Sequence, residues 1–348
     1  TIKYKGINFL AYGKVKYNPK YLSQSIFLKP NDIYKDTLRN LTRSHLKSLK
    51  NFKSTNINFS SIPNTDDELK MDIFLAPIEK YTLGLETELT HSNIRNIGTS
   101  AKFSISNRNT FRGAELLKLS FLGSYFNSKN GPGWEIGADA SLEVPRFMAP
   151  FGLSKSVPKR MSPRTLFSLG ASFQKNIGLD RKTFTVLADY KWNYNKQKSI
   201  QLEFFNTQYI RNLNVDNYFS VYASEYSKLK EVDNATATHT LPQNSPSNSA
   251  DILQFIQNVA RDIPFANTNP SEYQDNLNIL NRYNIITSDF LIPEIAYSYT
   301  YNNQENAKDA NFSFIKLRVA NSGNIMGVLS KQTNNRGQKT VFKIPIAQ

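Results

Sequence analysis

The residues of this sequence that could carry out chemistry are few and lie far apart. The chain has no cysteine, and its three histidines (His45, His91 and His239) are separated by long stretches of sequence. Disulfides, thiolate metal sites and cysteine nucleophiles are therefore excluded, and a histidine metal centre is disfavoured. The adjacent acidic residues at 66–68 lie in a polar loop, where carboxylates are normally solvated. Without a catalytic triad spacing or a glycine-rich phosphate loop, the sequence predicts no enzyme, no cofactor and no metal site.

The densest polar cluster is a turn between two long amphipathic segments. As local structure it predicts a polar hairpin, with an aromatic anchor and a glycine that permits positive φ. The carboxylates Glu86 and Glu88 need no catalytic role, because the polar interior of a β-barrel would account for them. The candidate residues of the turn are Asn107, Arg108, Asn109, Phe111, Arg112, Gly113 and Glu115.

The elements that hold this turn are predicted to be long β-strands, because residues 78–212 alternate apolar and polar side chains. These segments are about 10–15 residues long, whereas globular strands are usually five or six residues and membrane strands roughly nine to eleven. No run of about 18 apolar residues is present, so a transmembrane helix is excluded. Strand length and charged polar faces together predict antiparallel transmembrane β-barrel strands in preference to a soluble sandwich.

The alternation also assigns side chains to two faces. A lysine or arginine on the lipid face costs roughly 2–4 kcal/mol at the bilayer midplane, so the charged face must point into the lumen. The residues expected to face lipid are Leu83, Leu85, Phe121, Ile136, Leu142 and Val186. Those expected to face the lumen are Glu86, Glu88, Lys118, Asp139 and Lys191.

Residues 1–77 predict a small α+β module. Apolar residues and His45 recur at helical spacing between Tyr34 and Leu49, after a helix entry at 30–32 whose Asn and Asp could cap the first turn. Strands are expected at 53–60 and 69–75, with the helix laid on their sheet. Because Pro77 cannot donate to a strand ladder, the last strand should stop at or before Ala76 and leave a hinge.

The strand pattern is interrupted at about 213–290, where we expect an insertion outside the membrane. Residues 235–250 are typical of a flexible loop, and they precede a short amphipathic helix marked by Ile252 to Val259 and a weaker one near Leu277. Strands are predicted again at 290–301 and 311–319.

The formal charge of +15 raises the question of nucleic-acid binding. The basic residues are spread over strands, turns and the helix, with no aromatic stacking platform. A solvated face, or attraction to acidic lipid head groups, explains the charge better, and no nucleic-acid partner is predicted.

The segment from Gly98 to Glu115, followed by a leucine-rich strand, resembles the second and third barrel strands of the BamA/TamA superfamily, with the TamL-like group nearest. Residues 34–57 and 69–77 resemble the helix and two strands of a POTRA domain, joined directly to a first barrel strand at Tyr81. Residues 143–152 and 162–165 resemble the next strands and their turn. The family's Arg-Gly-Phe loop motif and aromatic-ended final strand are absent, so a partial barrel is expected.

This resemblance implies an α+β POTRA-like periplasmic domain at 1–77 and the N-terminal part of a transmembrane β-barrel at 78–348. It implies a protein of the outer membrane of a Gram-negative-type bacterium that inserts or exports client proteins. Implied partners are outer-membrane lipid, client outer-membrane proteins and a TamB-like periplasmic protein. The alternatives are a passive porin or secretion channel, and a soluble basic β-rich binding protein.

The first barrel strand is the candidate lateral gate. An unpaired strand edge in lipid leaves backbone groups unsatisfied, and it can accept an incoming strand by β-augmentation. A short polar loop at 92–96 ties this strand only to the second strand. The gate residues are Tyr81, Leu83, Gly84, Leu85, Thr87 and Leu89.

Overall fold

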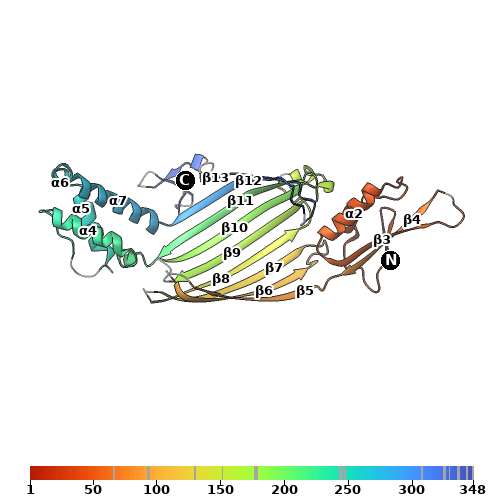
Figure 1. Ribbon diagram of the computed structural model, residues 1–348, viewed down its shortest axis with the longest axis horizontal. Helices are drawn as coiled ribbons and strands as arrows, with labels where there is room; N and C mark the ends of the chain where they lie inside the picture. The colour runs from red at the N-terminus through yellow and green to blue at the C-terminus, as the bar shows by residue number, and fades with distance from the viewer. Residues whose placement is uncertain are drawn as a thin grey trace.

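The computed structural model describes residues 1–346 except 66, 92–94, 129–130, 151, 176–178, 243–245, 247, 307–308, 324–326, 329, 335–337 and 342–343. An N-terminal module and a helical insertion lie at opposite ends of one large sheet (Figure 1). Most of the loop predicted at 92–96, and one acidic residue of the 66–68 loop, lie outside the described residues.

The N-terminal module contains two small antiparallel sheets. Strands β1 (Ile2–Tyr4) and β2 (Ile7–Phe9) form a separate hairpin, followed by helix α1 (Pro19–Leu22) and the 3-10 turn η1 (Ser23–Ser25). Helix α2 (Asp36–Ser48) packs on β3 (Phe52–Ser61), which pairs with β4 (Leu69–Pro77). The predicted helix and the two predicted strands are thereby confirmed.

The expected helix entry at 30–32 is wrong. Asn31 has a φ of 67°, and the Asp32 carboxylate accepts from the Lys29 backbone N–H at 2.9 Å, so these residues form a turn. The helix begins at Asp36 instead.

The predicted end of the last strand of the module is also wrong, by one residue. β4 includes Pro77, which pairs with Phe52, and the next N–H, that of Ile78, donates to the Asn51 carbonyl at 2.9 Å. Proline fits at this terminal position because the ladder continues through the N–H of Ile78. The break before β5 (Tyr81–Thr90) is present as expected.

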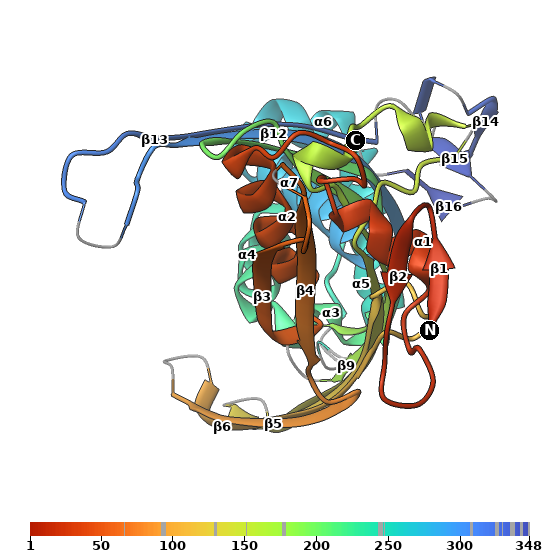
Figure 2. The same ribbon diagram turned by 90° about the vertical axis from the view of Figure 1, so that its right-hand side faces the viewer.

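Over the part of the chain that the structure describes, the main sheet is antiparallel, has nine strands in sequence order, and is not closed. Figure 2 shows it curling from β5 to β13 as an open trough. Its remaining strands are β6 (Arg95–Arg108), β7 (Leu116–Ser128), β8 (Gly131–Val144), β9 (Arg164–Lys175), β10 (Asp180–Asn193), β11 (Lys198–Leu213), β12 (Phe290–Asn302) and β13 (Phe314–Ser322).

The strand register confirms the predicted division into two faces. One cross-strand row of apolar side chains runs through Leu83, Ile105, Leu119, Ala140, Leu169 and Val186. Neighbouring rows of the opposite face pair Glu86 with Lys102 and Ser120 with Asp139. Large side chains of the apolar face are exposed, whereas small ones of the polar face such as Ser120 and Ser298 are buried. Crowding of this kind is expected on the inner side of a curved sheet.

Between β11 and β12 the chain forms a helical insertion with its own hydrophobic core, built around Tyr218, Phe219, Leu229, Ile256 and Ile279. Two helices were expected, and α5 (Ser249–Ala260) agrees with the first, while α7 (Pro270–Thr287) is longer than the second. The sequence did not indicate η4 (Val215–Asn217), α3 (Tyr218–Val221), α4 (Ala223–Ala235) or α6 (Ile263–Thr268).

None of the helices in the described part of the chain has the length and apolar character needed to cross a bilayer. The C-terminal residues form a small sheet of β14 (Gln332–Thr333), β15 (Lys339–Val341) and β16 (Ile344–Pro345).

Candidate functional site

The first feature of interest is the free edge of β5. Among the described residues β5 pairs only with β6, so its outer edge presents unpaired backbone groups. Leu83 and Leu85 on the apolar face are 67% and 71% exposed. Gly84 points to the other face, where an added Cβ would lie 2.8 Å from the Ser104 hydroxyl. The residues proposed for the gate that share the apolar face are Tyr81, Leu83, Leu85, Thr87 and Leu89.

The second feature is the polar turn, which connects the sheet to the N-terminal module. The Asn109 amide donates to the Lys16 carbonyl at 2.9 Å, and the Arg112 guanidinium donates to the Val15 carbonyl at 2.8 Å. In the other direction, the Asn18 backbone N–H donates to the Arg112 carbonyl at 2.7 Å. The turn is therefore a docking element and not only a strand connection.

The same turn fixes the start of β5. The Arg108 backbone N–H donates to the Lys80 carbonyl at 2.7 Å, and its guanidinium donates to the Thr82 hydroxyl at 2.6 Å. The side-chain amide of Asn51, the residue just before β3, donates to the Ala114 carbonyl at 3.0 Å. The N-terminal module, the hinge before β5 and the start of β5 therefore all contact the turn at 107–115.

An ion pair stabilises the turn from within. The Glu115 side chain is 1% exposed, and its carboxylate lies 2.5 Å from the Arg146 guanidinium. It also accepts from the Gly113 N–H at 2.9 Å and the Phe111 N–H at 3.3 Å. Burial raises the pKa of Glu115, but the hydrogen bonds from Arg146 and the backbone outweigh it and hold the pKa below its usual range. Arg146 also stacks on the Tyr21 ring, 4.1 Å from its centroid.

Two expectations about the turn are wrong. Phe111 is 64% exposed and anchors nothing inside the protein. Positive φ is adopted by Asn109, Arg112 and Ala114, not by Gly113. Glycine at 113 leaves space for the ion pair, because a Cβ there would displace the Glu115 carboxylate and the Arg146 guanidinium.

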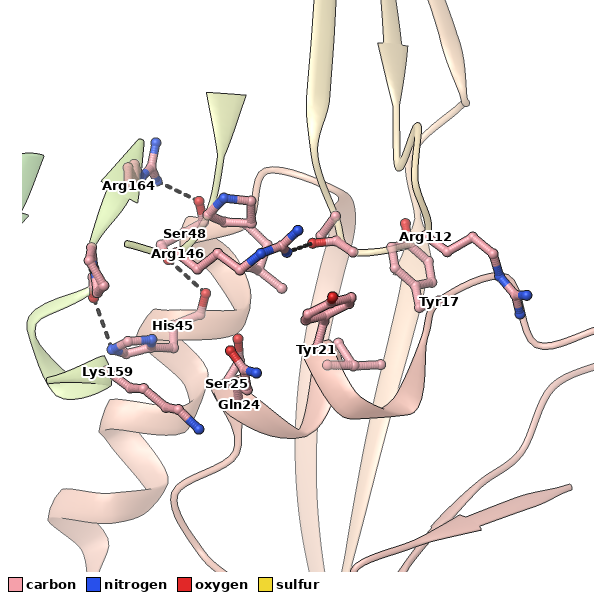
Figure 3. A pocket seen from close by; sticks show the side chains of 17 residues that line it. Tyr17, Tyr21, Gln24, Ser25, His45, Ser48, Arg112, Arg146, Lys159 and Arg164 are labelled. Atoms are coloured by element: carbon pink, nitrogen blue, oxygen red, sulfur yellow. Dashed lines mark hydrogen bonds between the residues drawn. The ribbon is translucent and has the colours of Figure 1, made fainter. Parts of the chain in front are cut away.

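A second set of contacts joins helix α2 to residues 159–164 (Figure 3). The Ser162 hydroxyl lies 2.9 Å from His45 Nε2, and the Arg164 guanidinium donates to the Ser48 carbonyl at 2.5 Å. His45 is 7% exposed, so its ring is buried, and its Nε2 has the Ser162 hydroxyl as a hydrogen-bond partner. Burial lowers the pKa of His45 below its usual value.

Between these two sets of contacts lies a small cavity of about 40 Å³. Its lining includes the cationic residues Arg112, Arg146, Lys159 and Arg164. In Figure 3 the Arg112 side chain points away from Tyr21 and His45. Within the described ranges, no group of three or more His, Asp or Glu side chains could hold a metal ion. The contacts around the cavity join the N-terminal module to the main sheet.

Sequence reasoning found the turn but missed its partners. Arg146 lies just after β8, where no helix or strand period marks a contact, and residues 15–18 have no regular secondary structure. A buried carboxylate at Glu115 required a cation, but nothing in the sequence indicated which of 43 basic residues supplies it.

Comparisons with known proteins gave solved structures only. No protein-family model matches the chain, and no curated protein sequence matches it. BamA from Haemophilus ducreyi lacking POTRA domains 1–3 is 12% identical with a TM-score of 0.46, over 87% of this chain and 46% of that chain. CdiB from Acinetobacter baumannii is 11% identical with a TM-score of 0.28, over 58% of this chain and 44% of that chain. The chain thus spans about half the length of each of these solved structures.

Proposed function

We propose that this chain is the N-terminal part of an outer-membrane barrel of the BamA/TamA superfamily, nearest to the TamL-like group, that inserts or translocates client proteins without making or breaking bonds. The observation that supports this most directly is the free edge of β5 on an open sheet with one continuous apolar face. The apolar face suits a lipid environment, and the mixed polar face suits a water-filled lumen.

The physical basis is the cost of an unsatisfied strand edge. In lipid, each unpaired backbone N–H or C=O costs several kcal/mol, so the edge of β5 must pair with a closing strand or a client strand. Closing a barrel pairs strands that are far apart in sequence, which makes the seam a late and weak contact. A seam at β5 therefore offers a site where a client strand adds by β-augmentation.

The N-terminal module supplies the second part of the proposal. We assign residues 1–77 to a POTRA-like domain in the periplasm, where a client segment or a TamB-like partner would bind. The docking of this module on the turn at 109–115 and on residues 159–164 would hold it beside the start of β5. A passive porin or secretion channel is the alternative, but simple conduction gives no reason for a module fixed at the first strand.

A disulfide across the seam tests the proposal. In the complete barrel, Leu85→Cys or Thr87→Cys would be cross-linked to the closing strand; the chain has no native cysteine to interfere. We expect loss of client insertion in the oxidised form, recovery on reduction, and an unchanged barrel by heat-modified gel mobility. The matched control joins Leu85→Cys to Phe103→Cys, which is its partner on β6, and leaves the seam free. Normal client insertion by the seam-locked barrel would refute lateral opening at β5.

Cysteine labelling tests the membrane assignment separately. A lipid-soluble maleimide should label Leu83→Cys and Ile136→Cys, whereas a membrane-impermeant reagent should label Glu86→Cys and Lys118→Cys through the lumen. Preferential lipid-phase labelling at the charged positions would reverse the proposed faces.

A further inference from the structure

The segment that joins β8 to β9, residues 146–163, lies at the end of the main sheet nearest the N-terminal module (Figure 1). We call it the β8–β9 segment. Its last part contacts helix α2, since the Ser162 hydroxyl lies 2.9 Å and the Arg160 carbonyl 3.5 Å from His45 Nε2. The segment is therefore held by the module on one side.

The first part of the β8–β9 segment is fixed to the apolar face of the sheet. The Met148 backbone N–H donates to the Thr165 hydroxyl at 2.9 Å. The Phe147 ring centroid lies 5.1 Å from that of Tyr190 and 5.9 Å from that of Trp192. Thr165 pairs directly with Tyr190, in a cross-strand row of the apolar face. The segment thus covers this face at the module end.

The covered part of the face ends abruptly. Thr165 and Tyr190 are 0% and 4% exposed, whereas Leu169 and Phe184, farther along the same two strands, are 52% and 47% exposed. β9 has 12 residues, of which the ten after Thr165 continue beyond the segment. A tilted membrane strand needs roughly nine to eleven residues to cross the hydrocarbon layer. The β8–β9 segment therefore lies at the level where the uncovered apolar face begins.

Amphipathic aromatic side chains of the apolar face gather at the same level. The register aligns Tyr190 with Tyr297 through one residue of β11, and Trp192 with Tyr299 through another. Tyrosine and tryptophan have an apolar ring and a polar group, and they favour the boundary between hydrocarbon and water. This row indicates a membrane boundary at the β8–β9 segment.

The composition of the β8–β9 segment suits that boundary. It has four basic residues and no acidic one. Met148 and Leu153 are 41% and 53% exposed, and Lys159 and Arg160 are also exposed. Among the described residues, neither of these two cations forms an ion pair with a carboxylate. Exposed apolar and cationic side chains on one segment are typical of protein surfaces that bind anionic lipid head groups.

We propose that the β8–β9 segment lies in the head-group layer of the leaflet on the module side and binds anionic phospholipid there. This inference rests on the proposed membrane barrel and adds a lipid contact outside the strands themselves.

A lipid surface fits the segment better than an acidic protein partner. Beside Met148 the segment borders an open groove of about 460 Å³, whose other lining residues include Phe167, Ala188 and Phe205. These three residues are aligned across β9, β10 and β11 on the apolar face. An acidic peptide would neutralise the cations but would leave this adjoining apolar surface in water. A bilayer accommodates both, because its charged head groups lie directly above its acyl chains.

The test uses the whole chain in phosphatidylcholine bilayers, with an NBD fluorophore attached to a single introduced cysteine. Quenching is measured with phosphatidylglycerol or phosphatidylcholine that carries a nitroxide near the glycerol end of its acyl chain. Leu153→Cys should be quenched by both lipids, and at least about fivefold more effectively by phosphatidylglycerol, the effect of one cation near an anionic surface. Leu169→Cys, on the uncovered apolar face, should be quenched equally by both. Ile263→Cys, 72% exposed in the helical insertion, gives the unquenched baseline.

Charge variants test the head-group contact in the Leu153→Cys background. Lys159→Gln together with Arg160→Gln should abolish the preference for phosphatidylglycerol, whereas Lys159→Arg with Arg160→Lys should keep it. The matched control, Lys228→Gln with Lys230→Gln in the helical insertion, should also keep it.

The outcomes separate the two proposals. A fluorophore at 153 that stays at the baseline while the one at 169 is quenched would overturn this inference and leave the barrel assignment intact. Equal quenching of the fluorophore at 153 by the two lipids, or a preference that survives loss of both cations, would also overturn it. A fluorophore at 169 that stays at the baseline would instead refute the membrane assignment itself.

Discussion

The sharpest consequence of the structure concerns the buried carboxylate of Glu115. Replacing Glu115 with alanine removes a charge-assisted hydrogen bond from Arg146 at 2.5 Å and leaves the N–H of Gly113 without its acceptor. A hydrogen bond to a charged group contributes about 1.5–3 kcal/mol, and an orphaned buried donor costs about 1–3 kcal/mol. Arg146 is 22% exposed and keeps its stacking on Tyr21, so its charge is not stranded. We therefore expect a local loss of about 3 kcal/mol, at the lower end of the range for broken buried ion pairs.

Hydrogen exchange measures this loss where it occurs. A decrease of about 3 kcal/mol in the opening free energy corresponds to roughly 150-fold faster exchange of the amides in the turn at 109–115. The matched control is Glu79→Ala, since Glu79 pairs with Lys53 at 3.1 Å but is 79% exposed. That substitution should change the hydrogen-exchange rates of the amides at 109–115 by less than about threefold, as expected for a surface ion pair. Equal effects of the two substitutions would show that Glu115 does not hold the junction.

Three further predictions follow from the same contacts. Gly113→Ala should lower the thermal midpoint, because its Cβ would displace the Glu115 carboxylate from Arg146, whereas Gly123→Ala, with nothing within 4 Å, should not. Because burial lowers the pKa of His45, the unfolded state takes up a proton before the folded state as pH falls, so the module should lose stability below about pH 6.5. His45→Gln should remove this pH dependence in urea titrations, and its persistence would show that another group is responsible. Ile256→Ala, at a side chain with 0% exposure, should destabilise the helical insertion by about 2–5 kcal/mol and speed its proteolysis, while Ile285→Ala, 64% exposed, should not.

The long strands and their two faces could be predicted from the sequence because they depend on local alternation. In a regular strand successive side chains point to opposite faces. Leu83 and Leu85 therefore lie on one face, and Glu86 and Glu88 on the other, whatever strand pairs with them. Helix α2 was predictable for the same reason, since its spacing of three and four is a property of neighbouring residues. The helices of the insertion were predicted less completely, because α4 and α7 bury few residues each and have weak apolar periods.

The junction was decided by the tertiary structure. The turn at 107–115 was recognisable as unusual, but its partners at residues 15–18, Asn51 and Arg146 are separated from it by long stretches of sequence. No local period encodes which arginine meets a buried carboxylate, because many exposed cations are equivalent until the chain has folded. The role of Gly113 shows the difference most clearly. Its side-chain space is limited by Glu115 and Arg146, and the crowding exists only once β7 and the segment after β8 lie side by side.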